Sequence, residues 1–427
     1  MNHVVQQFEK SIRWGLLESG VYQALLFIHQ IALFACVTPE LYGIIGTLFS
    51  LLYLSIAICD GGLDGTLPIF FPAAITARYQ IKGFLFKQLL PEICMLAILG
   101  VIAFWYSTFF TSMHITTLIM IGLLPLIEGM RKTAKKLLHL LFFNKALACI
   151  ELCALMLYLS SVWLCIMFNV NITVAHIIVP LFITSFASLV VFSFILYRWY
   201  CTLSQENNGC IIDLRRILTQ RFFNYITHIS HVFFTSNFLI PFFALHFGAA
   251  SAGGFKLISA LMSSVTIAFK KIFGGSATAF LAHLHHNDHE IKHEAFMLIL
   301  KKIWYGIGGC FIFFMIISFI LTQSHSAAFT LFNYPMIVAY IMLTFSEYFF
   351  MAYEIFFITQ QKSMYVTIIS LSSLAFVGCG LYITPNNSPL LLIMTLCCAR
   401  ILAFALTMTI WTHVYRTYSI SRSTPTS

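Results

Sequence analysis

The stretch LLPEICMLAILGVIAFWYSTFF, residues Leu89–Phe110, is long enough and apolar enough to cross a membrane as one helix. A spanning helix needs about 20 predominantly apolar residues, whereas a barrel strand needs about ten residues of alternating polarity. This stretch does not alternate, and a second long apolar run covers Trp304–Leu321. Because every backbone N–H and C=O must be paired inside hydrocarbon, these runs predict membrane-spanning α-helices.

The composition of the whole chain supports the same fold class. Of the 427 residues, 60% are hydrophobic and 9% are charged, whereas soluble domains have about 45–50% apolar and about 25% charged residues. The net charge of +9 would suit a nucleic-acid partner if the basic residues formed one patch, but they are spread along the chain. We therefore expect an all-α integral membrane protein that does not bind nucleic acid.

Windows of about 20 residues, ended at charge clusters and at Gly, Pro or Asn breaks, predict twelve spans. A chain that starts inside returns inside after six spans, so two six-helix bundles of parallel orientation are expected, at 1–199 and 222–416. A cytoplasmic linker at 200–221 joins them, and a cytoplasmic tail follows at 417–427. The predicted spans are 14–36, 42–60, 89–110, 115–132, 146–168, 176–199, 222–246, 250–272, 301–322, 327–353, 363–383 and 389–413.

The distribution of basic residues predicts the orientation of these spans. Of the 24 Lys and Arg residues, all but Lys256 and Arg400 fall at the termini or in the connections on the same side as the termini. Since basic residues near span ends stay in the cytoplasm, both termini are predicted to be cytoplasmic, in a multi-pass protein of the cell (inner) membrane. The opposite connections are very short, so they leave no room for the outer-face catalytic site of a membrane glycosyltransferase. We expect no enzyme activity.

A weak internal repeat relates the second spans of the two halves. Gly43–Leu51 aligns with Gly253–Leu261, and glycine pairs follow both segments, at 61–62 and 274–275. A duplication of six spans would place these segments in equivalent positions of the two bundles.

At these residues the chain resembles the polysaccharide-export branch of the multidrug/oligosaccharidyl-lipid/polysaccharide (MOP) flippase superfamily. The similarity covers Thr38–Gly43 (TPELYG) with Asp60–Leu63, and in the second half Phe247–Leu261 with Ala282–Leu284. Asp60 and Asp64 depart from the small or basic residue that many relatives have there. The resemblance implies a flippase that moves a lipid-linked oligosaccharide or polysaccharide precursor by alternating access, alongside the glycan biosynthesis machinery.

Polar residues inside the predicted spans are candidates for a substrate cavity, because charged groups in a membrane are costly and usually face a bundle interior or water. Lys256 and Arg400 suit the oxygens of a pyrophosphate or another anionic lipid headgroup. The polar stripes of spans one and seven add candidates at helical spacing: Glu18 and His29, and Arg221, Asn224, His228 and His231. The alternative is that such residues only form hydrogen bonds between helices.

Two further features concern ions. Glu347 and Glu354 share a face of span ten and are candidates to balance the cations or to carry a coupling proton. His285, His289 and His293 would share a face if the tract 283–293 were helical, which can bind a divalent cation. Because a His-rich tract is only compositional evidence, we expect a solvated connector and no metal.

The function predicted from the sequence is therefore flipping of a lipid-linked sugar by a monomer embedded in the bilayer. No Walker loop is present, so we expect no nucleotide or other cofactor, and coupling to H⁺ or Na⁺ is the expected source of energy. The alternative is a multidrug extrusion antiporter of the same fold, which would need an acidic cavity for its cationic substrates.

Overall fold

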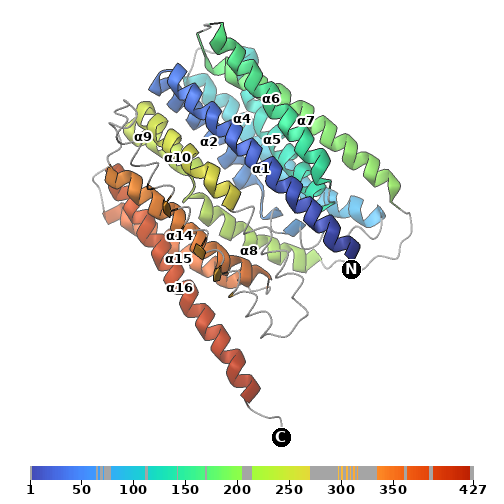
Figure 1. The fold of residues 1–427 in the computed structure, drawn as a ribbon, viewed down its shortest axis with the longest axis vertical. Helices are drawn as coiled ribbons and strands as arrows, with labels where there is room; N and C mark the ends of the chain where they lie inside the picture. The colour runs from blue at the N-terminus through green and yellow to red at the C-terminus, as the bar shows by residue number, and fades with distance from the viewer. Residues whose placement is uncertain are drawn as a thin grey trace.

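The computed structural model describes most of the first half of the chain and a smaller share of the second. Within the described residues the chain folds into twelve α-helices and the connections between them (Figure 1). The described residues are 2–63, 66–67, 71, 78–110, 114–141, 143–168, 171–203, 214–269, 334–359, 363–383 and 388–423, with isolated positions between 297 and 315.

The helices form two groups that follow the order of the chain. Figure 1 shows α1 and α4–α7 on one side and α14–α16 on the other, with α2 and α8–α10 between them and both termini at the same end. The first half contains α1 (Asn2–Cys36), α2 (Pro39–Cys59), α4 (Arg78–Phe110), α5 (Ile115–Leu140), α6 (Asn144–Met167) and α7 (Val174–Thr202). The second half contains α8 (Leu214–Val232), α9 (Ser236–Phe247), α10 (Ala249–Phe269), α14 (Tyr334–Thr359), α15 (Ser363–Ile383) and α16 (Pro389–Ser423).

Ten of the twelve predicted spans each overlap one of these helices. The seventh, 222–246, covers both α8 and α9, and the ninth, 301–322, lies largely outside the described residues. The main difference is length, because α1, α4, α5 and α16 continue well past the predicted ends. A hydropathy window stops at Lys, Arg and Gln, but these residues are good helix formers, so the helix itself continues. The predicted linker at 200–221 is shorter than expected for the same reason, since α7 ends at Thr202 and α8 begins at Leu214.

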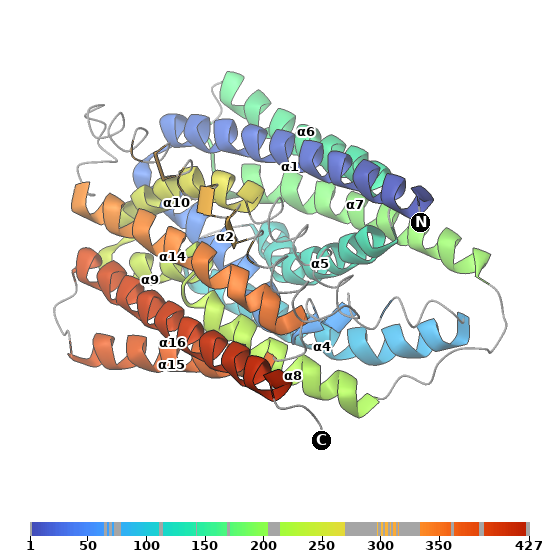
Figure 2. The ribbon, with the colours of Figure 1, turned by 60° about the horizontal axis from the view of Figure 1, so that its bottom comes forward.

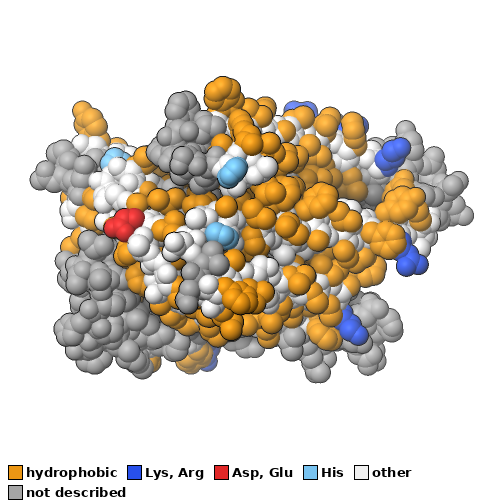
Figure 3. Space-filling model, turned by 90° about the horizontal axis from the view of Figure 1, so that it is seen from above, with side chains coloured by type: hydrophobic (Ala, Val, Ile, Leu, Met, Phe, Trp, Pro, Cys, Tyr) orange, Lys and Arg blue, Asp and Glu red, His pale blue; other side chains and the backbone are white. Residues whose placement is uncertain are grey.

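The composition of the helices and of the surface confirms the predicted all-α membrane fold. Five described helices are long and apolar enough to cross a membrane, and the bent pair α8–α9 is a sixth candidate. Large apolar side chains such as Ile98, Trp105 and Phe194 are exposed, which water would not tolerate over such an area but lipid does. Figure 3 shows one such face, on which hydrophobic side chains predominate and the few Lys and Arg lie along the rim.

The two halves meet most closely where α2 and α10 begin. A side chain at Gly43 would collide with the backbone carbonyl of Ala249, and one at Gly253 would lie 2.5 Å from the carbonyl oxygen of Pro39. The contact is reciprocal, since each glycine admits the backbone of the other helix. The aligned glycines of the internal repeat therefore pack against each other. This contact lies at the predicted outer end of the bundle, and which end faces the cytoplasm stays a prediction.

Candidate functional site

A cavity of about 540 Å³ lies between the two halves. This volume is in the range of small-molecule sites, which usually measure about 300–1,000 Å³. Its walls come from α1, α2, α5, α6 and α7 in the first half, and from α9, α10, α14, α16 and the α8–α9 connection in the second. Because both halves contribute, a relative movement of the halves would change the cavity directly.

Lys256 of α10 reaches this cavity across the contact between α2 and α10. A side chain at Gly46 of α2 would lie 3.1–3.3 Å from the aliphatic stem of Lys256, so the missing side chain leaves room for that stem. The Lys256 ammonium lies 5.9 Å from the centre of the Phe49 ring, which also lines the cavity. The contact is a weak cation–π interaction and leaves the ammonium charge available to a ligand.

Arg400 of α16 supplies a second cation, also from the second half. Its side chain is only 1% exposed, and its guanidinium carbon lies 3.9 Å from the centre of the Phe234 ring and 5.8 Å from that of Phe350. Stacking on an aromatic ring fixes the plane of the guanidinium and therefore the direction of its N–H donors.

The span predicted at 222–246 is broken where it meets the cavity. The axes of α8 and α9 differ by 44°, and Phe234, Thr235, Ser236 and Asn237 all line the cavity at the break. Thr235 is the N-cap of α9, and its hydroxyl donates a hydrogen bond to the carbonyl of Val232. Irregular backbone in a membrane is tolerated where it lines a cavity, and a helix N-terminus there favours anions.

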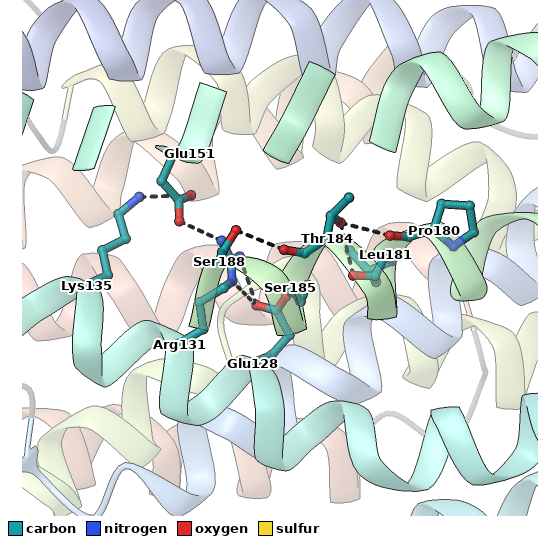
Figure 4. A network of polar contacts seen from close by, with 9 residues as sticks. All are labelled: Glu128, Arg131, Lys135, Glu151, Pro180, Leu181, Thr184, Ser185 and Ser188. Carbon is teal, nitrogen blue, oxygen red and sulfur yellow. Dashed lines mark hydrogen bonds and ion pairs between the residues drawn. The ribbon is translucent and has the colours of Figure 1, made fainter. Parts of the chain in front are cut away.

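The first half contributes a network of buried charges that the sequence analysis did not recognise (Figure 4). The guanidinium of Arg131 in α5 donates to Glu128 Oε2 at 2.9 Å and to Glu151 Oε1 of α6 at 2.6 Å. Lys135 lies 3.3 Å from the other oxygen of Glu151, and the hydroxyl of Ser185 in α7 donates to Glu128. Two carboxylates and two cations thus neutralise each other within one wall.

The structure places Arg131 and Lys135 within α5 and not in the connection that follows it, whereas the side of the membrane on which they lie stays a prediction. Arg131 lines the cavity, because α5 continues past it to Leu140. Its charge is neutralised by Glu128 and Glu151. The sequence contained a signal for this arrangement. Glu128, Arg131 and Lys135 follow one another at helical spacing, and Glu151 lies within the apolar run predicted as span five.

The charges around the cavity are asymmetric. The charged residues among its lining are Arg131, Glu151, Lys256 and Arg400. Arg131 and Glu151 form an ion pair at 2.6 Å, whereas no ion pair with a described carboxylate is found for Lys256. The cavity is therefore cationic, with Lys256 and Arg400 on the side of the second half.

The remaining lining of the first half is aromatic and polar. Tyr22, Gln23 and Gln30 of α1, Tyr53 of α2 and Tyr158 of α6 all face the cavity. Such side chains offer hydroxyl and amide groups for hydrogen bonds together with flat apolar rings. The first half therefore presents an amphipathic wall opposite the cations.

The predicted residues of α8 lie elsewhere. In the described part of the chain, Arg221, Asn224, His228 and His231 are not among the residues that line the cavity. The guanidinium of Arg221 donates to the carbonyl of Gly61 at 2.6 Å and to Gln88 Oε1 at 2.7 Å, so it joins the second half to the first. Helix α8 packs against α15 (Figure 2), and the hydroxyls of Thr227 and Thr367 lie 3.0 Å apart in this contact.

The other predicted site residues are also accounted for. His231 Nε2 is 3.2 Å from the hydroxyl of Ser370, and its Nδ1 is 3.9 Å from Glu354, so both residues belong to a contact within the second half. His29 is buried behind the cavity wall, edge-on to the ring of Tyr158. The side chains of Glu18 and Glu347 and the His tract 283–293 lie outside the described residues.

Neither a protein-family model nor a curated protein matches this sequence. Solved structures do match over nearly the whole chain. An outward-facing multidrug resistance MATE family transporter of the MOP superfamily has a TM-score of 0.65 at 12% identity, covering 97% of both chains. The MATE multidrug transporter DinF-BH has a TM-score of 0.64 at 14% identity, covering 95% of both chains.

A third structure is a MOP superfamily transporter from Pyrococcus furiosus, with a TM-score of 0.55 at 12% identity and 95% of both chains covered. It is described as having a binding pocket of reverse polarity that suggests a different function. These neighbours share the fold that the resemblance implied, whereas the polysaccharide-export branch stays a prediction. The chain has the fold of the MATE family transporters of the MOP superfamily.

Proposed function

We propose that this protein is an alternating-access exporter of amphipathic molecules that carry an anionic group. The observation that carries the proposal is the convergence of Lys256, Arg400 and the N-terminus of α9 on one cavity between the halves. Lys and Arg bind phosphate and carboxylate oxygens by charge and by directed N–H donors. The N-terminus of a helix adds a partial positive charge and backbone donors to the same site.

Two contacts between the halves flank the cavity and would have to alternate. Gly43 and Gly253 close one end, and at the other end Arg221 holds the turn at Gly61. A side chain at Gly62 would collide with the Arg221 carbonyl, so this second contact is also a close approach of backbones. An exporter that opens each end in turn needs separate contacts of this kind, with the substrate site between them.

The similar solved structures favour a multidrug exporter more directly than a polysaccharide flippase, because two of them are described as multidrug transporters. We therefore propose export by alternating access, as for a multidrug exporter, but of an anionic and not a cationic substrate. A lipid-linked oligosaccharide meets the requirement, since its pyrophosphate suits Lys256 and Arg400 and its sugars suit the tyrosines and amides of the first half. Any other lipophilic anion with a polar group would also meet it.

The second candidate is export of lipophilic cations, as a multidrug antiporter. The observation that favours it is the aromatic lining, which includes Tyr22, Phe27, Tyr53 and Tyr158, since aromatic faces attract cations. Against it, Glu151 is the one acidic residue among the described lining residues and is already bound to Arg131 and Lys135.

Transport in vesicles separates the two candidates. The purified protein is reconstituted into liposomes with either a fluorescent lipid pyrophosphate or a fluorescent lipophilic cation, and movement across the bilayer is followed by quenching from outside. We expect the pyrophosphate to cross faster than in protein-free vesicles and the cation to cross at the protein-free rate. Liposomes containing the double variant Lys256→Ala, Arg400→Ala serve as the matched control. Transport of the cation alone would overturn the proposal and favour the second candidate.

A further inference from the structure

A second pocket lies beside the cavity, within the first half. It has a volume of about 270 Å³ and is enclosed by α2, α4, α5 and one residue of α7. Apart from Ser55, its lining side chains are apolar: Leu48, Phe49, Leu51, Leu52, Leu99, Ile102, Ala103, Ile121, Leu124, Pro125 and Ile178. The hydroxyl of Ser55 donates to the carbonyl of Leu51 at 2.8 Å within its own helix. An apolar pocket without available polar partners stays dry and takes up hydrocarbon, as an apolar cavity of about 150 Å³ takes up benzene.

Helix α2 separates this pocket from the cationic cavity. Leu48, Leu51, Leu52 and Ser55 recur at helical spacing and line the pocket, whereas the face roughly 100° further round the helix, with Phe49 and Tyr53, lines the cavity. Phe49 belongs to both linings. The centre of the Phe49 ring is also 5.9 Å from the Lys256 ammonium, so one residue of the apolar pocket is in contact with a cation of the cavity.

The pocket also reaches the lipid-facing surface. Leu124 at its inner side is 3% exposed, whereas Ile102 at its rim is 55% exposed. Helices α4 and α5 pack closely at Gly100, where a side chain would collide with the backbone carbonyl of Gly122. In a bilayer the exposed rim faces acyl chains, so hydrocarbon can enter the pocket without crossing water.

We propose that this pocket, from Ile102 to Phe49, holds the hydrocarbon chain of the exported molecule while its anionic group is bound at Lys256. The proposal rests on the proposed function and adds that the substrate is a lipid anion with a long hydrocarbon chain. The continuity of the two linings at Phe49 is the reason to assign the pocket to the substrate and not to a bilayer phospholipid. An anion at Lys256 places the first carbons of its tail beside the Phe49 ring.

Filling the pocket should weaken binding only of ligands that have a tail. Ala103 is partly buried in the lining, and Ala103→Phe would occupy the space of several methylene groups. We expect this variant to bind geranylgeranyl pyrophosphate about tenfold more weakly than the native protein, and inorganic pyrophosphate equally well. Ile98→Phe is the matched control, because Ile98 lies on the same helix and is 60% exposed. Ser55→Phe fills the pocket from α2 if Ala103→Phe does not fold.

The native protein provides a readout that needs no variant. A geranylgeranyl pyrophosphate with a photoreactive group on its tail should label peptides that contain Leu52 or Leu124, and unlabelled geranylgeranyl pyrophosphate should suppress the labelling. The inference is overturned if excess phospholipid suppresses the labelling equally, or if Ala103→Phe and Ser55→Phe bind the tailed ligand normally. Failure of the proposed function is a different result, in which Lys256→Ala changes the binding of neither pyrophosphate.

Discussion

Replacing Lys256 or Arg400 by alanine is expected to reduce the affinity for an anionic amphiphile by about 10- to 100-fold and to stop its transport. Hydrogen bonds to charged groups contribute about 1.5–3 kcal/mol each, and about 1.4 kcal/mol corresponds to a factor of ten in affinity. Arg400→Lys should recover only part of the loss, because an ammonium does not reproduce a planar guanidinium stacked on Phe234 at 3.9 Å. Ligand titration of the purified variants measures the affinities, and the vesicle assay measures transport.

The matched controls are cations on the exposed surface. Lys82 and Arg198 are exposed, so Lys82→Ala and Arg198→Ala remove the same charges away from the cavity and should leave binding unchanged. Unfolding temperatures of all variants show whether a loss of binding reflects a loss of fold. Native affinity in both cavity variants, with normal folding, would contradict the role assigned to Lys256 and Arg400.

Glu151→Gln is expected to destabilise the first half strongly. Breaking a buried ion pair by removing one partner costs about 3–5 kcal/mol, because the other charge is left buried without compensation. Here Lys135 loses the carboxylate that lies 3.3 Å away, and Arg131, which lies 2.6 Å from Glu151, keeps Glu128 as its acidic partner. The free energy of unfolding in detergent, measured by denaturant titration, should fall by this amount.

A second substitution tests whether charge is the cause. The double variant Glu151→Gln, Lys135→Gln has one cation and one carboxylate left in the network and should recover part of the stability. Glu40 is exposed at the start of α2, so Glu40→Gln is the matched control and should change stability little. A single Glu151→Gln variant as stable as Glu40→Gln would mean that the network does not hold α5 against α6.

The sequence predicted the membrane fold well because hydrophobicity over the length of a helix is a local property. Lys256 and Arg400 could also be found from local sequence, because each is a charge within an apolar segment. The structure brings both to one cavity. The paired glycines Gly43 and Gly253 were found as an internal repeat, although the sequence did not indicate that they touch. Whether these cations bind substrate is a prediction that the experiments above address.

The features that escaped prediction depend on tertiary contacts. A positive-inside count treats a basic residue near a span end as solvated, so it gives no sign that Arg131 is paired with Glu151 of another helix. The break at 233–235 was overlooked because the segment is apolar, although Thr235 and Ser236 are residue types favoured at helix N-caps. The polar stripe of α8 is not among the described residues that line the cavity, and its role towards a substrate stays a prediction.

The central claim is that the cavity selects its ligand by negative charge, and one series of ligands tests it directly. Three compounds share the geranylgeranyl tail and differ in the head group, which is a pyrophosphate, a neutral alcohol or a trimethylammonium group. Their dissociation constants are measured with the purified protein in lipid nanodiscs at one salt concentration. We expect the pyrophosphate to bind about 10- to 100-fold more tightly than the alcohol, and the ammonium compound to bind most weakly. Tightest binding by the ammonium compound would contradict the claim.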